Sequence, residues 1–121
     1  MTWKLDSDRP IYAQLLEQIQ MQIVSGQYPS GSKLPSVREL AAQAGVNPNT
    51  MQKAFAELER VGLIQTMRTA GRFVTEDTLL IQNIRQSLAR EQLAGFFQNM
   101  RQLGYQKEEI LSFLKATYEE G

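Results

Sequence analysis

Four polar side chains stand close together near the middle of the chain: Asn49, Thr50, Gln52 and Lys53. Amides such as those of Asn49 and Gln52 can pair bidentately with adenine. The Thr50 hydroxyl can bond a phosphate or touch a thymine methyl group, and the Lys53 ammonium can meet a phosphate or a guanine. Acids come only later, at positions 57 and 59. Because an acid would be repelled by phosphates, this order suits a segment whose leading end meets nucleic acid.

Two short helices are predicted to position these side chains. Ser36 and Glu39 form the capping-box pattern S-x-x-E, which begins a helix that Gly45 ends. Asn47 is a capping residue for a second helix, and Pro48 suits the first position of that helix. The break between them has the length of the turn in a helix-turn-helix, whose second helix enters the major groove of DNA. The same polar residues would also suit an ordinary solvated helix face, and the residues alone leave both interpretations open.

The flanking sequence predicts a mainly α-helical fold with a small β-hairpin. A first helix is expected over 10–25, where apolar residues recur at helical spacing. Strands are expected over 63–67 and 72–75, joined by a short turn that contains Gly71. Two strands alone are marginally stable, so this hairpin must lean on the helices.

Helical patterns return after the hairpin, are interrupted at Gly104 and resume over 106–118. We therefore expect a DNA-binding unit over 1–75 and a helical tail over 76–121. The tail is too small to bury a core of its own, so its apolar stripe needs a partner. A second copy across a two-fold axis is the economical choice. The residues assigned to that dimer interface are Leu80, Ile84, Leu88, Phe96, Phe97, Met100 and Phe113.

Composition excludes several other classes of protein. The chain of 121 residues contains no cysteine and no histidine, which removes disulfides, thiolate metal sites and the commonest general base. No apolar run approaches the ~18–20 residues that a membrane-spanning helix needs. The N-terminus lacks the apolar core of a signal peptide, so a cytoplasmic location is predicted. No Gly-rich phosphate loop, metal cluster or nucleophile arrangement is visible, so we predict neither an enzyme nor a tightly bound cofactor.

Basic residues gather in the part of the chain that holds the two short helices and the hairpin. The net charge of the whole chain is zero, but 33–75 contains Lys33, Arg38, Lys53, Arg60, Arg68 and Arg72 against three glutamates. Arg38 is expected on the same side as Lys53, where it could reach a phosphate or a guanine. Arg68 and Arg72 flank the hairpin turn and would place charge beside the DNA backbone or minor groove.

At these residues the sequence strongly resembles the GntR family of bacterial transcription regulators. The segments that carry the resemblance run from Pro10 to Val74: "PIYAQL", "G-S-K-LPS-V-R-EL-A", "VNPNT", "A-ELE-GLI" and "G-R-F-V". The resemblance implies a winged helix in which the hairpin is the wing. It also implies that the DNA contacts include Arg38, Asn49, Thr50, Gln52 and Gly71, which match family contact positions.

Three positions depart from the family pattern. Pro48 stands where many members carry a polar or basic side chain, so no side-chain contact is expected there. Gln52 replaces an arginine, and Ala70 replaces a more polar residue at the wing tip. These changes should alter the DNA sequence that the protein prefers.

The short tail is similar to that of the YtrA-like subgroup of the family. This resemblance implies that the tail mediates dimerisation and that the protein controls a transporter operon. A dimer would bind a palindromic site with half-sites about one helical turn apart or a multiple of it. Repression is the simpler mode of action, because occlusion of a promoter needs only binding. The tail aromatics are expected to be core residues rather than a pocket, and any small-molecule effector stays unknown.

Two alternative functions compete with this one. The first is a winged-helix module that binds another protein without binding DNA. The second is a carboxylate-based hydrolase, which would need two acids converging in a cleft. Glu57 and Glu59 point to different faces of their helix, which disfavours the hydrolase.

Overall fold

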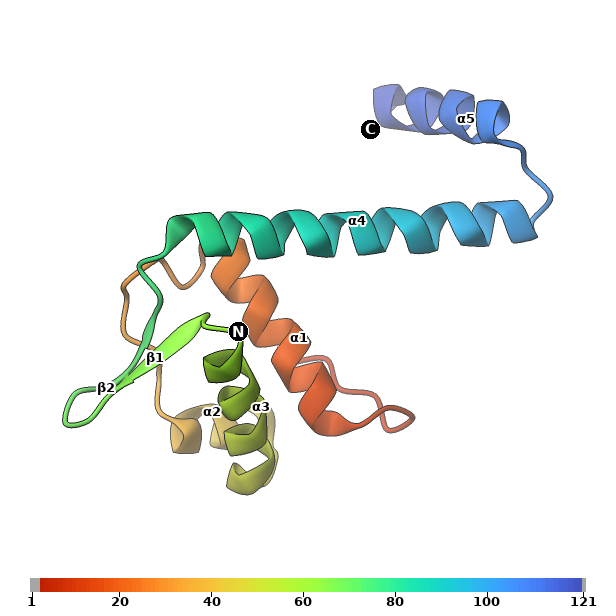
Figure 1. Ribbon diagram of the computed structural model, residues 1–121. Coiled ribbons are helices and arrows are strands. Elements are labelled where there is room, and N and C mark those ends of the chain that lie inside the picture. The colour runs from red at the N-terminus through yellow and green to blue at the C-terminus, as the bar shows by residue number, and fades with distance from the viewer. Residues whose placement is uncertain (1–2, 121) are drawn as a thin grey trace. The chain divides into compact units, whose positions relative to one another are not determined.

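The computed structural model describes residues 3–120, and it has the predicted mainly helical fold with one antiparallel hairpin (Figure 1). The elements, in chain order, are α1 (Ile11–Val24), α2 (Val37–Ala44), α3 (Pro48–Arg60), β1 (Ile64–Met67), β2 (Gly71–Val74), α4 (Thr78–Gln102) and α5 (Lys107–Glu120). The chain divides into two compact units between Arg85 and Gln86. The first unit contains α1 to β2 and the start of α4, and the second contains the rest of α4 and α5.

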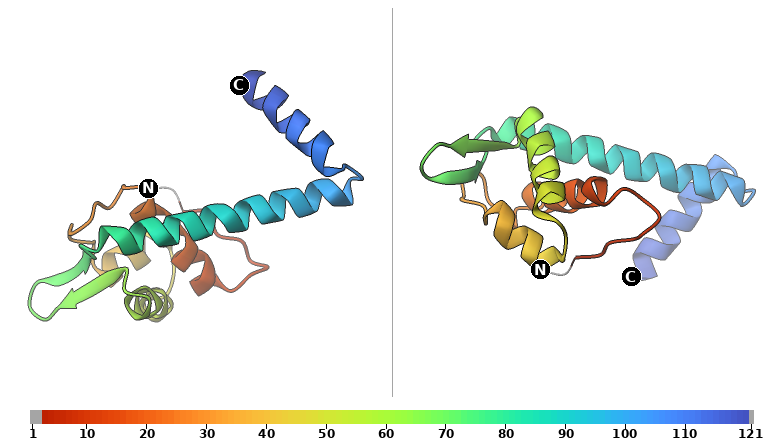
Figure 2. Two further views of the ribbon diagram at one scale, coloured as in Figure 1. Left: turned by 45° about the horizontal axis from the view of Figure 1, so that its top comes forward. Right: turned by 90° about the horizontal axis from the view of Figure 1, so that it is seen from below.

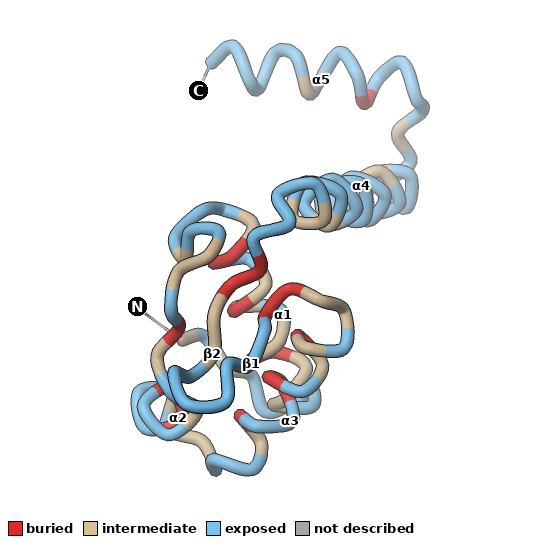
Figure 3. The backbone as a smooth tube through the Cα atoms, turned by 60° about the vertical axis from the view of Figure 1, so that its left-hand side comes forward, coloured by how far each residue is buried: buried red, intermediate tan, exposed pale blue. Residues whose placement is uncertain are grey.

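A hydrophobic core holds the first unit together, and it lies between α1, α2, α3 and the base of the hairpin. Four of its residues come from one face of α3, where Met51, Ala54, Phe55 and Leu58 are all 0% exposed. This is the face that the spacing predicts, because residues three and four apart share one side of a helix. Figure 3 shows most of the buried stretches in this unit, with a further one in α5. The cluster consists of Leu15, Ile19, Ile23, Leu34, Leu40, Ala41, Met51, Ala54, Phe55, Leu58, Leu63, Ile64 and Val74.

The predicted caps are present at the starts of both short helices. The Ser36 hydroxyl accepts a hydrogen bond from the Glu39 amide at 3.1 Å, and the Ser36 amide donates to the Glu39 carboxylate at 3.4 Å. Gly45 ends α2 in the left-handed conformation at φ 70°. The Asn47 side chain accepts from the Asn49 amide at 2.7 Å, with Pro48 at the first position of α3. Each such N-cap stabilises a helix by ~1 kcal/mol.

The hairpin is supported by a short piece of the loop that precedes α2. The Leu34 amide donates to the Arg72 carbonyl and the Val74 amide donates to the Ser32 carbonyl, both at 2.9 Å. This loop therefore pairs with the outer edge of β2 and relieves the marginal stability of two isolated strands. One detail of the prediction was wrong: Gly71 lies in β2 and pairs with Met67, so the turn is formed by 68–70. Gly71 closes the turn because its φ of +106° is a conformation that glycine adopts without strain.

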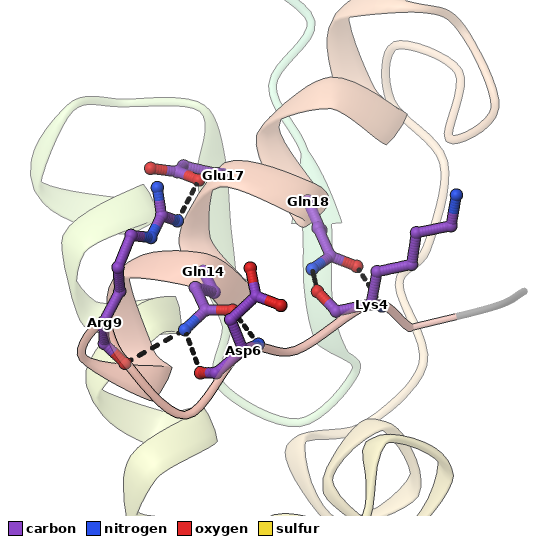
Figure 4. A network of polar contacts seen from close by, with 6 residues as sticks. All are labelled: Lys4, Asp6, Arg9, Gln14, Glu17 and Gln18. Carbon is purple, nitrogen blue, oxygen red and sulfur yellow. Dashed lines mark hydrogen bonds and ion pairs between the residues drawn. The ribbon is translucent and has the colours of Figure 1, made fainter.

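The segment before α1 is held in place by two glutamines of that helix, as Figure 4 shows. The Gln14 side chain donates to the carbonyls of Asp6 and Arg9 at 2.7 and 3.0 Å, and accepts from the Asp6 amide at 2.6 Å. Gln18 makes the same exchange with the main chain of Lys4. The side-chain amides of Gln14 and Gln18 pair with the extended segment much as a neighbouring β-strand would. Their spacing fits, because four residues of helix rise about as far as two residues of extended chain.

Gln14 should contribute more to stability than Gln18, because its side chain is 3% exposed and the bonds of Gln18 lie at the surface. Replacing Gln14 with alanine should lower the free energy of unfolding by about 1–3 kcal/mol, since the partly buried main-chain groups of Asp6 and Arg9 lose their partner. Urea denaturation measures this loss. Gln18→Ala is the matched control and should cost less than about 1 kcal/mol. Equal losses for the two variants would contradict a distinct role for the buried amide.

The tail helices leave most of their apolar side chains uncovered. Helix α4, described along its whole length, contains no buried residue. Its start contributes to the first unit, where Ile81 and Ile84 pack against the core, so the compact unit extends beyond residue 75. Within the second unit, Ile110 is 1% exposed and the rings of Tyr105 and Phe113 lie 6.0 Å apart. The predicted interruption at 104 is confirmed, since α4 ends before it and α5 begins after it.

Candidate nucleic-acid interface

The leading end of α3 presents its polar side chains to solvent. Asn49, Gln52 and Lys53 are exposed and Thr50 is half-buried, while the opposite face of the helix fills the core. The hairpin extends away from α2 and α3 in all three ribbon views (Figures 1 and 2). The fold therefore offers two protruding features, a helix end rich in hydrogen-bonding groups and a two-stranded wing.

Lys53 is supported by an aromatic ring from a different helix. Its ammonium nitrogen lies 4.0 Å from the centre of the Tyr12 ring in α1. A cation over an aromatic face is attracted by ~0.5–1 kcal/mol at an exposed site. Tyr12 thus restricts the position of the Lys53 ammonium group, which stays exposed to solvent. The spacing of residues in the sequence does not predict this pair.

A depression of about 310 Å³ lies between the start of α2 and the wing. Its lining includes Lys33, Ser36 and the tip residues Thr69, Ala70 and Gly71. The Lys33 side chain passes over Gly71, since a Cβ built on that glycine would stand 3.1 Å from Lys33 Cε. Lys33 was not among the predicted contacts, although its basic side chain lies beside the wing.

The two arginines of the hairpin differ in their surroundings. Arg68 is exposed in the turn. The Arg72 side chain is only 26% exposed and forms an ion pair with Glu59, with 3.2 Å between Arg72 Nε and Glu59 Oε1. Arg72 also donates from Nη2 to Gln52 Oε1 at 3.3 Å, and its guanidinium lies 5.5 Å from the centre of the Phe55 ring. Arg72 thus has three partners within the protein, and its predicted contact with DNA stays a prediction.

Both acids of α3 are paired with arginine. Arg60 Nε donates to Glu57 Oε1 at 2.9 Å, and this bond lowers the pKa of the Glu57 carboxyl. Glu59 accepts from Arg72 and also from the Thr66 hydroxyl, the latter at 2.6 Å. The carboxylates that follow the polar front of the helix are therefore compensated locally. Sequence spacing could not identify the Glu59 pair, because its partners lie in the hairpin.

The remaining predicted DNA contact, Arg38, is exposed on α2, and the predicted tail residues vary in exposure. Leu80 and Ile84 belong to the first unit: Ile84 packs on its core, and a Cβ on Gly62 would stand 3.2 Å from Leu80 Cδ2. Leu88, Phe97 and Met100 are half-buried. Phe96 and Phe113 are 37% and 53% exposed.

Residues 3–120 offer neither a metal-binding cluster nor a helix suited to a membrane. Within that range, no group of three or more acidic, histidine or cysteine side chains is arranged to hold a metal ion. Over the same residues, none of the helices combines the length and the apolar character needed to cross a membrane.

A helix-turn-helix with an exposed polar second helix, followed by a hairpin, defines the winged-helix class of DNA-binding proteins. Residues 11–74 match the family described as "Bacterial regulatory proteins, gntR family". This match covers more than half of the chain, which therefore belongs to the GntR family of transcription regulators, as its sequence motifs predict. The family consists of DNA-binding regulators and not of enzymes.

Two relatives from Bacillus subtilis (strain 168) align with the chain well beyond the winged helix. The uncharacterized HTH-type transcriptional regulator YhcF is 42% identical over 98% of this chain and 97% of its own length. The HTH-type transcriptional repressor YtrA is 37% identical over 90% of this chain and 85% of its own length. Both alignments include the tail, which agrees with the predicted YtrA-type organisation.

Two solved structures are informative. A GntR family transcriptional regulator from Listeria monocytogenes superposes with a TM-score of 0.87 at 41% identity, covering 93% of this chain and 98% of that one. The AraR DNA-binding domain in complex with operator ORE1 superposes with a TM-score of 0.54 at 34% identity. That match covers 62% of this chain and 94% of the AraR chain.

Proposed function

We propose that the protein is a dimeric transcriptional repressor that inserts α3 into the major groove of a palindromic operator. The observation that carries this proposal is the exposed polar front of α3 beside the wing, with its buried face locked in the core. A helix held in this way can present side chains to base edges without losing its own packing. The likeness to the AraR domain, which was solved in complex with an operator, supports DNA binding by this fold.

The side chains divide by chemistry into base readers and phosphate contacts. Asn49, Thr50 and Gln52 carry the amide and hydroxyl groups suited to base edges. The cationic side chains of Arg38, Lys53 and Arg68 are exposed and suited to phosphates. Gly71 is exposed in the wing, and the Lys33 side chain that passes over it adds a cation at the same place. The last residue of the predicted set, Arg72, acts indirectly through its hydrogen bond to Gln52.

The tail is proposed to form the dimer. Several of its apolar side chains are open to solvent, among them Leu93, Phe96, Leu103, Leu111 and Phe113. Burying a Leu or Phe side chain stabilises an interface by about 1.5–3 kcal/mol before the costs of association. A second copy supplies the same apolar surface across a two-fold axis, and it places two α3 helices on one operator.

Repression and the choice of target rest on similarity. The YtrA relative is a repressor by its name, and its alignment covers most of both chains. Occlusion of a promoter needs no contact other than binding, so repression requires the fewest assumptions. The resemblance to the YtrA-like subgroup extends the proposal to control of a transporter operon. No site is assigned to a small-molecule effector.

Selection of bound sequences from random double-stranded DNA tests the proposal. We expect a palindromic consensus whose half-sites are about 10 base pairs apart, or a multiple of this, because a symmetric dimer reads both halves alike. Sequencing of the enriched pool gives the result. An unenriched pool would contradict DNA reading altogether, whereas a single asymmetric motif would contradict the dimer alone.

A further inference from the structure

The contact between Arg72 of the wing and Gln52 of α3 bears on which base is read. We propose that Arg72 is a positioning residue that orients the Gln52 amide and thereby makes the protein select guanine over adenine at one base pair of each half-site. This inference rests on the proposed function, because it requires α3 to enter the major groove. It concerns a residue that spacing alone places at the DNA backbone.

The direction of the Gln52 amide follows from the chemistry of its partner. An arginine guanidinium carries only hydrogen-bond donors, so the amide oxygen must face it. Arg72 Nη2 and Gln52 Oε1 are 3.3 Å apart in the structure. The Gln52 oxygen is therefore turned toward the wing, and its NH₂ group is the part left to meet a base.

Arg72 is itself held in place by two neighbours, one of which is fixed in turn by a third residue. Its Nε bonds Glu59 Oε1 at 3.2 Å, and the same carboxylate oxygen accepts from Thr66 at 2.6 Å. The guanidinium also lies over the ring of Phe55, which is 0% exposed. A donor fixed by a carboxylate and a buried ring cannot follow the glutamine if the glutamine rotates, so the bond to Gln52 favours one amide orientation.

The orientation changes which base fits best. A free glutamine reads adenine bidentately, donating to N7 while its oxygen accepts from the N6 amine. When the oxygen is drawn to Arg72, the presented NH₂ group meets the adenine N6 amine donor to donor. Guanine instead offers two neighbouring acceptors, N7 and O6. The Arg72–Gln52 bond therefore favours guanine.

The ion pair also predicts that Arg72 does not contribute a phosphate contact. Its charge is compensated by Glu59, whereas Arg68 is exposed in the turn. Each phosphate contact adds about 0.9 to the slope of log affinity against log salt. Loss of Arg68 should reduce that slope by about one, and loss of Arg72 should leave it unchanged.

The experiment compares full-length wild type, Gln52→Ala, Arg72→Met and the double variant in selections from random DNA. Gln52→Ala identifies the base pair that Gln52 reads, as the position where preference is lost. Wild type should carry guanine there. Arg72→Met keeps the aliphatic stem over Phe55 but removes the donor, and should shift the guanine-to-adenine ratio toward adenine by about tenfold. In the Gln52→Ala background the same change should have no effect at that position.

Arg68→Met is the matched control, since it removes a wing arginine without touching Gln52. It should weaken binding to all sequences equally, and a shift at the Gln52 position would instead show a general effect of the wing. Circular dichroism shows whether Arg72→Met folds. If it does not, Glu59→Gln is the substitute, because it removes the ion pair that holds Arg72 and should shift the guanine-to-adenine ratio in the same direction.

The outcomes separate this inference from the proposed function. A wild-type pool without enrichment overturns the proposed function. An enriched pool overturns only the inference if it shows adenine at the Gln52 position, no position that depends on Gln52, or a preference unchanged in Arg72→Met. The wild-type base at the position that Gln52→Ala identifies decides the matter even when neither Arg72→Met nor Glu59→Gln is stable.

Discussion

Replacing both Arg38 and Lys53 with glutamate is expected to abolish sequence-specific binding of the operator, with a loss of at least ~100-fold in affinity. Both side chains are exposed, one on α2 and one on the polar front of α3. Reversing their charges replaces attraction to phosphates by repulsion at two points of the same face. Fluorescence anisotropy with an operator taken from the selected consensus measures the loss.

The fold and the oligomeric state should survive this change, because neither side chain is buried. The Lys53 variant gives up only the contact with the Tyr12 ring. The matched control is Arg90→Glu with Lys115→Glu, which makes the same change of net charge on exposed tail positions. Binding that persists in the Arg38 and Lys53 double variant would show that the proposed docking face is wrong. A winged-helix module that binds another protein would then be the better account.

Replacing Phe96 and Phe97 with serine is expected to convert dimers into monomers. The two rings contact each other edge to face with their centres 5.6 Å apart, and Phe96 is 37% exposed although it is fully apolar. Two such rings buried in a dimer would each contribute about 1.5–3 kcal/mol, which is most of the affinity of a modest interface. Light scattering should then report a mass near the 13.8 kDa of one chain.

Leu79→Ser is the control for this experiment. Leu79 is 69% exposed at the start of α4, lies in the first unit and is not among the residues assigned to the interface. Its replacement should leave the dimer mass unchanged. The phenylalanine variant should still recognise a half-site, but weakly, because it presents one α3 helix instead of two. A dimer mass in that variant would place the interface elsewhere on the chain.

Local features of this protein could be predicted from the sequence because they depend on residues close together in the chain. The capping box at Ser36, the Asn47 cap and the buried face of α3 all follow from spacings of two to four residues. The motif order supported the family assignment for the same reason. The pairing of the loop before α2 with β2 could not be predicted in this way, because it joins Ser32 to Val74, which are far apart in the chain.

The candidate interface was predicted as a set of residues but not as a set of interactions. Asn49, Gln52 and Arg38 are exposed as expected, and their contacts with bases or phosphates stay predictions. Arg72 was expected at the DNA backbone because it flanks the turn. In the structure its guanidinium contacts α3. The Glu59 carboxylate compensates its charge, and the ring of Phe55 lies against it.

The amino-acid sequence by itself determined the helix-turn-helix, the wing and the polar leading end of α3, because periodicity and capping act over a few residues. Only the tertiary structure decided that Tyr12 holds Lys53, that Ile84 packs on the winged-helix core, and that Arg72 faces Gln52. These contacts join residues far apart in the chain. They form where packing of the core brings side chains within a few ångströms, and no spacing along the sequence encodes that distance.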